Sequence, residues 1–195
     1  MNKQLEIKRF LNQNNIGLFG LLETKIRGSN WLKVKNVMCD DWAIATNSSY
    51  HKGGRIWIIW QPSQVVVTVQ HVTAQLIHAK VFDKTRDCHF LFTLVYGFNK
   101  DKERESLWES LVSIGKGIDS SWMVCGDFNS LMHLNERIGG AQVQWHDVLP
   151  MKQMAVRCDL TELKSIGSFF TWNNKHENGS KVYSKIDRVL INTEW

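Results

Sequence analysis

Short segments rich in β-branched and aromatic residues recur along the whole chain, and they predict a protein built largely of strands. Helical spacing of apolar residues appears in only a few places between them. Such a mixture of hairpins and helices is typical of a layered α/β or α+β sandwich rather than of a parallel βαβ series. The predicted strands are an apolar segment within 16–25 and the ranges 41–46, 55–60, 64–69, 75–82, 89–95, 121–125, 168–172 and 181–191, and the predicted helices are 3–14, 102–113 and 146–158.

The length and composition of the chain predict a single domain, 1–195, with a substantial core. Hydrophobic residues make up 43% of it and charged residues 22%, close to the averages for globular proteins. The net charge of +5 mildly favours a polyanionic partner such as nucleic acid. The four cysteines form no CxxC pair, which argues against a zinc ribbon. Because no signal peptide or bilayer-length apolar run is recognisable, we expect an intracellular protein without a membrane partner.

One apolar run ends in a glycine that is followed at once by polar side chains. Residues 122–125 precede Gly126, and Asp127 and Asn129 then flank a phenylalanine. Glycine, aspartate and asparagine are common turn residues, so an ordinary surface turn is one interpretation. The alternative is a ligand site at the carboxyl end of a strand, where sheet proteins often bind what they act on.

Other predicted strands also end in residues that can carry chemistry. Glu23 closes GLFGLLE, Tyr96 closes TLVY, Trp172 follows FFT, and Asp187 lies among apolar residues in KVYSKIDRVL. Each of these alone has an ordinary interpretation, as a surface carboxylate, an aromatic at the edge of the core or a core tryptophan.

Taken together and in order, these segments resemble the endonuclease/exonuclease/phosphatase superfamily, and in particular the apurinic-type endonuclease domain of plant LINE-type (non-LTR) retrotransposons. The resemblance implies a four-layered α/β sandwich, in which two packed mixed β-sheets are flanked by helices. The motifs that carry it are LLETK (21–25), VYGF (95–98), GDFN (126–129), NERIGG (135–140), GSFFTWNN (167–174) and SKIDRVLIN (184–192).

The resemblance also implies a role for each matching residue. Glu23 is the implied ligand of a divalent metal, Mg²⁺ or Mn²⁺. Tyr96 and Asn129 are implied to contact the scissile phosphate, and Asp127 to orient or deprotonate the attacking water. Asp187 matches an acid that normally pairs with a histidine. The implied substrate-binding residues next to these are Thr171 and Trp172.

These residue types suit phosphodiester hydrolysis. A hard cation held by one or two carboxylates offsets the negative charge that repels a nucleophile, and Mg²⁺ suits such sites because it keeps several waters. A positioned carboxylate takes a proton from water. Neutral donors such as the Asn129 amide and the Tyr96 hydroxyl stabilise charge that develops on phosphate oxygens.

The chain departs from the family pattern at both ends, and we therefore expect a truncated domain. The family's first strand carries an asparagine that has no counterpart here, and the family's closing Ser-Asp-His segment is also missing, so Asp187 has no evident histidine partner. Loss of both strands would leave neighbouring strands without ladder partners. No reverse transcriptase segment accompanies the domain.

Several basic residues near the motifs predict a DNA surface, although a solvated face is an equal alternative. They are Lys25, Arg27, Lys175, Lys181, Lys185 and Arg188. Because 181–191 alternates as one strand, Lys185 and Asp187 are predicted to share a face, which makes Lys185 the candidate phosphate contact.

The sequence leaves three functional hypotheses open. The first is a Mg²⁺-dependent endonuclease that nicks DNA, nuclear by resemblance. The second is a catalytically inactive retrotransposon remnant that binds nucleic acid or nothing. The third is a member of the same superfamily that acts on RNA or a phosphoinositide.

Overall fold

The computed structural model describes residues 3–26, 30–51, 53, 55–176 and 180–195. Two compact units make up the chain, residues 1–94 and residues 95–195, and each is described by itself. Among the described residues, no helix has the length and apolar character that a membrane span requires.

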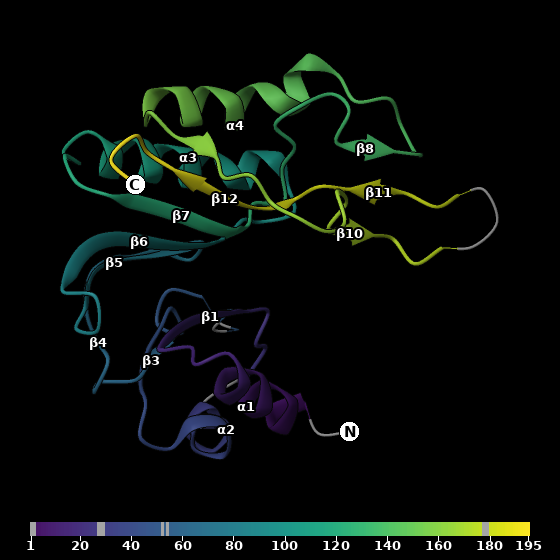
Figure 1. Ribbon diagram of the computed structural model, residues 1–195. Coiled ribbons are helices and arrows are strands. Elements are labelled where there is room, and N and C mark those ends of the chain that lie inside the picture. Colours follow the sequence, from purple (N-terminus) through teal and green to yellow (C-terminus); the bar gives the residue numbers. More distant parts are fainter. Residues whose placement is uncertain (1–2, 27–29, 52, 54, 177–179) are drawn as a thin grey trace. The chain divides into compact units, whose positions relative to one another are not determined.

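The first unit has a small antiparallel sheet covered by two helices (Figure 1). Its sheet has the order β1-β3-β2, and buried Trp57 and Ile59 of the central strand pack with Leu11 and Met38 of the helices. Strand β1 packs closely on β6 (Cys88–Tyr96) at Gly20. A Cβ added to Gly20 would lie 2.5 Å from a methyl of Leu94. The elements of this unit are α1 (Lys3–Gln13), β1 (Leu18–Leu22), α2 (Asn30–Cys39), β2 (Ala43–Thr46), β3 (Ile56–Trp60), β4 (Val65–Val72), β5 (Leu76–Asp83) and most of β6 (Cys88–Tyr96).

The second unit places helices α3 (Asp101–Gly115) and α4 (Trp145–Arg157) over strands β7 (Trp122–Asp127) and β12 (Asp187–Ile191) (Figure 1). A small second sheet has the order β10-β11-β8. The larger sheet of the protein has the order β4-β5-β6-β7-β12-β9, and its last three strands belong to this unit. The elements of the unit are α3 (Asp101–Gly115), β7 (Trp122–Asp127), β8 (Arg137–Ile138), α4 (Trp145–Arg157), β9 (Thr161–Glu162), β10 (Trp172–Asn173), β11 (Tyr183–Ser184) and β12 (Asp187–Ile191).

The predicted α/β architecture is confirmed, with a six-stranded sheet and flanking helices. Helical spacing also predicts apolar faces with Leu107, Trp108 and Leu111 in the helix at 102–113 and with Val148, Met151, Met154 and Ala155 in the helix at 146–158, and both faces are confirmed. Leu107 and Leu111 of α3 are fully buried, as are Val148, Met151 and Met154 of α4. These side chains pack the helices against the sheet and thereby support the strand ends where the candidate site lies.

Two strand predictions near the carboxyl end are wrong. Residues 168–171 form no strand, because Gly167 has a φ of +103° and the Ser168 hydroxyl donates to the Phe170 carbonyl, which folds this segment locally. The predicted strand at 181–191 is broken at residues 185–186. Its two halves, β11 and β12, belong to different sheets.

Two errors concern the amino-terminal helices. Helix α2 was not predicted, because Lys35 interrupts its apolar stripe of Trp31, Val34 and Met38; the buried Lys35 ammonium donates to the Asp40 carbonyl instead. In α1, helical spacing predicts a common face for Leu5, Phe10 and Leu11, and this prediction is only partly correct. Leu11 is buried, whereas Leu5 and Phe10 are exposed.

Candidate active site

The GDFN motif forms a tight turn at the end of β7. The Asp127 Oδ1 atom accepts a hydrogen bond from the Asn129 backbone N–H at 2.8 Å, and the Asn129 Nδ2 atom donates to the Gly97 carbonyl at 2.7 Å. Asn129 has a φ of +47°, which asparagine tolerates better than most residues. Phe128 between them is fully buried and stacks on Trp108 of α3, with ring centroids 6.5 Å apart. The turn therefore has a core anchor and two polar side chains outside it.

Gly126 is required by the backbone of this turn. Its φ is +135°, and an added Cβ would lie 2.1 Å from the Val95 carbonyl oxygen of the neighbouring strand. The closest approach is to a backbone atom, so the contact cannot be relieved by a side-chain rotation. The glycine therefore allows β7 to lie close to Val95 directly before Asp127.

Gly126→Ala is expected to destabilise the fold by about 3 kcal/mol or more, because strained backbone and a backbone clash add together. Urea denaturation at neutral pH measures the change in the free energy of unfolding. Gly117→Ala is the matched control, since no atom lies within 4 Å of its added Cβ, and it should change stability by less than about 0.5 kcal/mol. Equal stability of the two variants would contradict this account of Gly126.

Asp127 and Asp187 are direct neighbours across two antiparallel strands. They are register partners at the ends of β7 and β12. The next residues along the two strands, Phe128 and Ile186, are joined by a hydrogen bond from the Phe128 N–H to the Ile186 carbonyl. Because hydrogen-bonded and non-hydrogen-bonded pairs alternate in antiparallel strands, Asp127 and Asp187 form a non-hydrogen-bonded pair. In such pairs the Cα atoms are about 4.5 Å apart and the side chains are close. Two carboxylates in this arrangement repel one another, and the charge of Arg104, which interacts with Asp127, offsets part of that repulsion.

Thr171 connects the small sheet to this pair. Its hydroxyl oxygen accepts hydrogen bonds from the backbone N–H groups of Ile186 and Asp187, both at 3.1 Å. Trp172, the next residue, pairs with Ser184 and leaves 45% of its surface exposed. The predicted substrate-binding segment thus lies next to Asp187, with Thr171 in a structural contact and Trp172 open to solvent.

The remaining predicted residues are distributed between the two units. Tyr96 belongs to the second unit, directly before Gly97, and is only 3% exposed. Glu23 belongs to the first unit, has a φ of +54°, and its carboxylate lies 3.5 Å from the Lys25 ammonium. The structure therefore brings Tyr96, Asp127 and Asp187 into one unit, whereas Glu23 is in the other. Arg27, a predicted basic residue, lies outside the described residues.

Lys185 is not on a common strand face with Asp187, which corrects the prediction from alternation. Its ammonium forms an ion pair with Glu162 at 2.6 Å and lies 5.0 Å from the centre of the Phe169 ring. The break at residues 185–186 places it outside both β11 and β12. A role for Lys185 in phosphate binding stays a prediction. A phosphate would have to compete with Glu162 for the Lys185 ammonium.

The residue after Asp187 in β12, Arg188, forms a buried ion pair. Arg188 donates from both terminal nitrogens to the carboxylate of Glu136, at 3.0 and 2.9 Å, and also contacts Glu162 at 3.2 Å. Burial alone would raise the pKa of Glu136, but hydrogen bonds from Arg188 and from backbone N–H groups, together with the Arg188 charge, hold it below its usual value. The NERIGG and IDR motifs therefore meet in a charged cluster inside the second unit.

Sequence reasoning missed the roles of Glu136 and Arg104. Glu136 was visible only as part of NERIGG, and no local pattern links it to Arg188, which is 52 residues away. Arg104 lies in the predicted helix at 102–113 at a position that reads as surface, yet it is only 6% exposed. A charged residue directly beside the apolar face of α3 was the one available signal for it.

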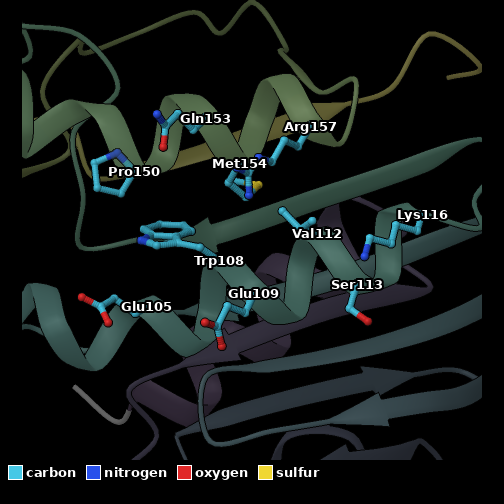
Figure 2. Close-up of a pocket in the computed structure, with 10 residues that line it drawn as sticks. All are labelled: Glu105, Trp108, Glu109, Val112, Ser113, Lys116, Pro150, Gln153, Met154 and Arg157. Atoms are coloured by element: carbon cyan, nitrogen blue, oxygen red, sulfur yellow. The ribbon is translucent and has the colours of Figure 1, made fainter.

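A cavity of about 450 Å³ lies between α3 and α4, and it contains none of the predicted site residues (Figure 2). Glu105 lies toward one end of it and Lys116 toward the other, with Glu109 and Arg157 between them (Figure 2). Trp108 lines the cavity and stacks on Phe128, so only one ring separates this groove from the GDFN turn.

The donor set at the strand ends fits a hard divalent cation. In the described part of the chain, no three histidine, cysteine, aspartate or glutamate side chains form a group that could hold a metal ion. Asp127 and Asp187 are instead register partners, so their two acidic side chains lie on the same face of the sheet. Mg²⁺ is usually bound by one or two carboxylates and keeps several waters, so this pair suits it.

Comparison with known proteins agrees with this architecture. No protein-family model and no curated protein matches the sequence. The endonuclease domain of TRAS1, a telomere-specific non-LTR retrotransposon, has a TM-score of 0.68 at 14% identity, over 98% of this chain and 80% of that chain. A mannosyl-6-phosphatase of Bacteroides thetaiotaomicron gives 0.63 at 12% identity, over 97% and 76%. D. rerio TDP2 complexed with single-strand DNA product gives 0.62 at 12% identity, over 98% and 78%.

The fold is therefore that of the endonuclease/exonuclease/phosphatase proteins, which include nucleases and phosphatases. A retrotransposon endonuclease domain is among the structures that share it.

Proposed function

We propose that this chain is a metal-dependent phosphodiester hydrolase that nicks DNA, of the kind found in non-LTR retrotransposons. The observation that carries the proposal is the side-by-side pair of Asp127 and Asp187 at strand ends, next to the GDFN turn. Two adjacent carboxylates are unfavourable for folding alone. Their presence in a fold shared with nucleases and phosphatases favours a role in binding a cation and activating water.

The proposed roles follow from the contacts of each side chain. The Asn129 N–H orients the Asp127 carboxylate through Oδ1, and Asp127 accepts the proton of the attacking water. The Asn129 amide, oriented by the Gly97 carbonyl, donates to the scissile phosphate. Tyr96 supplies a second neutral donor at its hydroxyl. Exposed Trp172 contacts the nucleic acid beside them.

Mg²⁺ or Mn²⁺, when bound, would offset the phosphate charge and polarise a bound water. Asp187 would help to hold it, and Glu23 is proposed as a further ligand from the LLETK motif. Lys185 remains a candidate phosphate contact, with its charge shared with Glu162.

The chain is expected to convert supercoiled plasmid to the relaxed form with Mg²⁺ and not with excess chelator. Glu23→Gln and Asp187→Asn should each reduce the initial rate by about 10²-fold or more, because each removes a charge that the reaction requires. Gel electrophoresis over a time course measures the rates of nicking.

Asp119→Asn is the matched control, because this exposed acid precedes the opposite end of the same strand, β7. It should nick at the rate of the unaltered chain. Nicking that survives in chelator, or in both active-site variants, would contradict the proposal. A folded chain that binds plasmid without nicking it would favour the inactive nucleic-acid-binding alternative, and cleavage of RNA or a phosphoinositide alone would identify the third hypothesis.

A further inference from the structure

Arg104 is a buried cation at the start of α3 that holds the segment after β6. Its Nη1 atom donates to the carbonyls of Phe98 and Asn99, at 2.7 and 2.9 Å, and its Nη2 atom donates to the Asp101 carboxylate. The side chain is 7% exposed, whereas that of Asp101 is 81% exposed. One arginine thus fixes two successive carbonyls of the connection between Tyr96 and α3.

That connection is bonded directly to the GDFN turn. The Gly97 N–H donates to the Asp127 carbonyl at 2.8 Å, and the Gly97 carbonyl accepts from the Asn129 side chain at 2.7 Å. An added Cβ on Gly97 would lie 2.4 Å from the Phe128 carbonyl and 3.3 Å from Cδ of Arg104. Gly97 is therefore packed between the Arg104 side chain and the turn.

We propose that Arg104 is a positioning residue for the reaction: it fixes Gly97–Asp101 so that Gly97 orients the Asn129 amide and the end of β7 that carries Asp127. The inference rests on the proposed function, because only then are Asp127 and Asn129 catalytic. The hydrogen bonds of Arg104 go to Phe98, Asn99 and Asp101. Arg104 therefore acts on Asp127 and Asn129 through the backbone of Gly97 and Phe98.

The electrostatic environment of Arg104 agrees with this position. Burial lowers the pKa of Arg104, and the negative charges of Asp101 and Asp127 oppose that shift. Asp127 is therefore near enough to interact with the guanidinium. Since Asp101 is largely exposed and lies in the same turn of α3, it does not by itself account for a buried arginine that also binds two loop carbonyls.

Arg104→Met is expected to reduce kcat for plasmid nicking by about 10²-fold, with KM changed less than about twofold, because a displaced catalytic group slows the reaction more than it weakens binding. Arg104→Lys should recover part of kcat, since an ammonium can still donate to a loop carbonyl. Lys100→Met is the matched control, because the Lys100 side chain forms an exposed ion pair with Glu103 beside the same helix turn. It should leave kcat and KM unchanged.

Amide hydrogen exchange supplies a readout that does not depend on activity. In Arg104→Met the N–H groups of Gly97 and Asn129 should exchange at least about tenfold faster, as expected for a local opening. The Trp122 N–H, which donates to Asn192 at the other end of β7, should keep its rate. Equal acceleration at Trp122 would mean a general loss of stability and would overturn the positioning role.

The outcomes separate the two proposals. Unchanged exchange at Gly97 and Asn129 in both Arg104 variants overturns the inference, whatever the activity. If Arg104→Met does not fold, the same comparison is made with Arg104→Lys. An unaltered chain that does not nick DNA refutes the proposed function, and selective exchange at Gly97 and Asn129 would then still support Arg104 as the residue that positions the turn.

Discussion

Asp127→Asn is expected to reduce the nicking rate by about 10²–10⁴-fold while leaving the protein about as stable as before. The rate falls because an amide cannot accept the proton of the attacking water. Stability does not fall, because the asparagine keeps an oxygen for the Asn129 N–H, which now donates to Asp127 Oδ1. Removing one of the two like charges should relieve about 0.2–1 kcal/mol of cross-strand repulsion in the absence of metal, while the attraction between Asp127 and Arg104 is lost.

Asp127→Ala separates the two roles of this side chain. It should be equally inactive but less stable by about 1 kcal/mol, because the Asn129 N–H loses its acceptor. Urea denaturation in chelator measures both variants beside the unaltered chain, and plasmid nicking in Mg²⁺ measures their rates. Full activity in Asp127→Asn would refute the proposed site, and a large loss of stability in that variant would refute the described turn geometry.

Arg188→Met is expected to have the largest effect on stability, about 3–5 kcal/mol. The change leaves the Glu136 carboxylate buried without its cation, and breaking such a pair from one side is strongly destabilising. Both side chains are almost completely buried, with exposures of 0% for Arg188 and 1% for Glu136. Urea denaturation at pH 7 measures the loss. Arg188→Met combined with Glu136→Gln should recover part of it, because the neutral amide avoids an unpaired charge.

The dependence on pH gives a second check of this pair. The pKa of Glu136 in the folded protein lies below its ordinary value of 4.5, so the pair contributes its full stability above that pH. The contribution is lost as the pH falls through the lower folded-state pKa. The difference between the unaltered chain and Arg188→Met should therefore shrink in acid. Lys100→Ala, which removes only the exposed pair with Glu103, should cost less than about 1 kcal/mol at either pH.

Local patterns were sufficient to predict most of the elements and the order of the motifs. Periodicity gave the buried faces of α3 and α4, because burial of an apolar stripe is the main requirement on a helix that packs on a sheet. The GDFN turn was predicted from one glycine and two polar residues, and the structure gives the reason for the glycine in the 2.1 Å approach of its added Cβ to Val95.

The errors arose where distant contacts decide the local structure. Residues 181–191 alternate well enough for one long strand, yet the Thr171 hydroxyl accepts the N–H groups of Ile186 and Asp187 and the two halves pair in different sheets. No pattern within that segment indicates a hydroxyl that precedes Ile186 by 15 residues and Asp187 by 16. Lys185 was misplaced for the same reason.

The sequence predicted several residues of the candidate site but not the buried contacts that hold them. Resemblance selected Asp127, Asn129 and Asp187, which the structure brings into one unit. Arg104 and Glu136 could not be selected, because buried charges carry no periodic signal and their partners are fixed only by the fold. The contribution of Glu23 awaits the test of its glutamine variant.

The spacing between Asp127 and Asp187 is set by main-chain pairing of β7 and β12, which makes it independent of most side chains. Any substitution that keeps these strands in register leaves the two carboxylates facing each other. Substitutions at neighbouring positions are therefore limited mainly by packing, while the arrangement of the two acids stays the same. The insertion of a single residue into β12 would be more damaging than many substitutions, because it would turn Asp187 to the opposite face of the sheet.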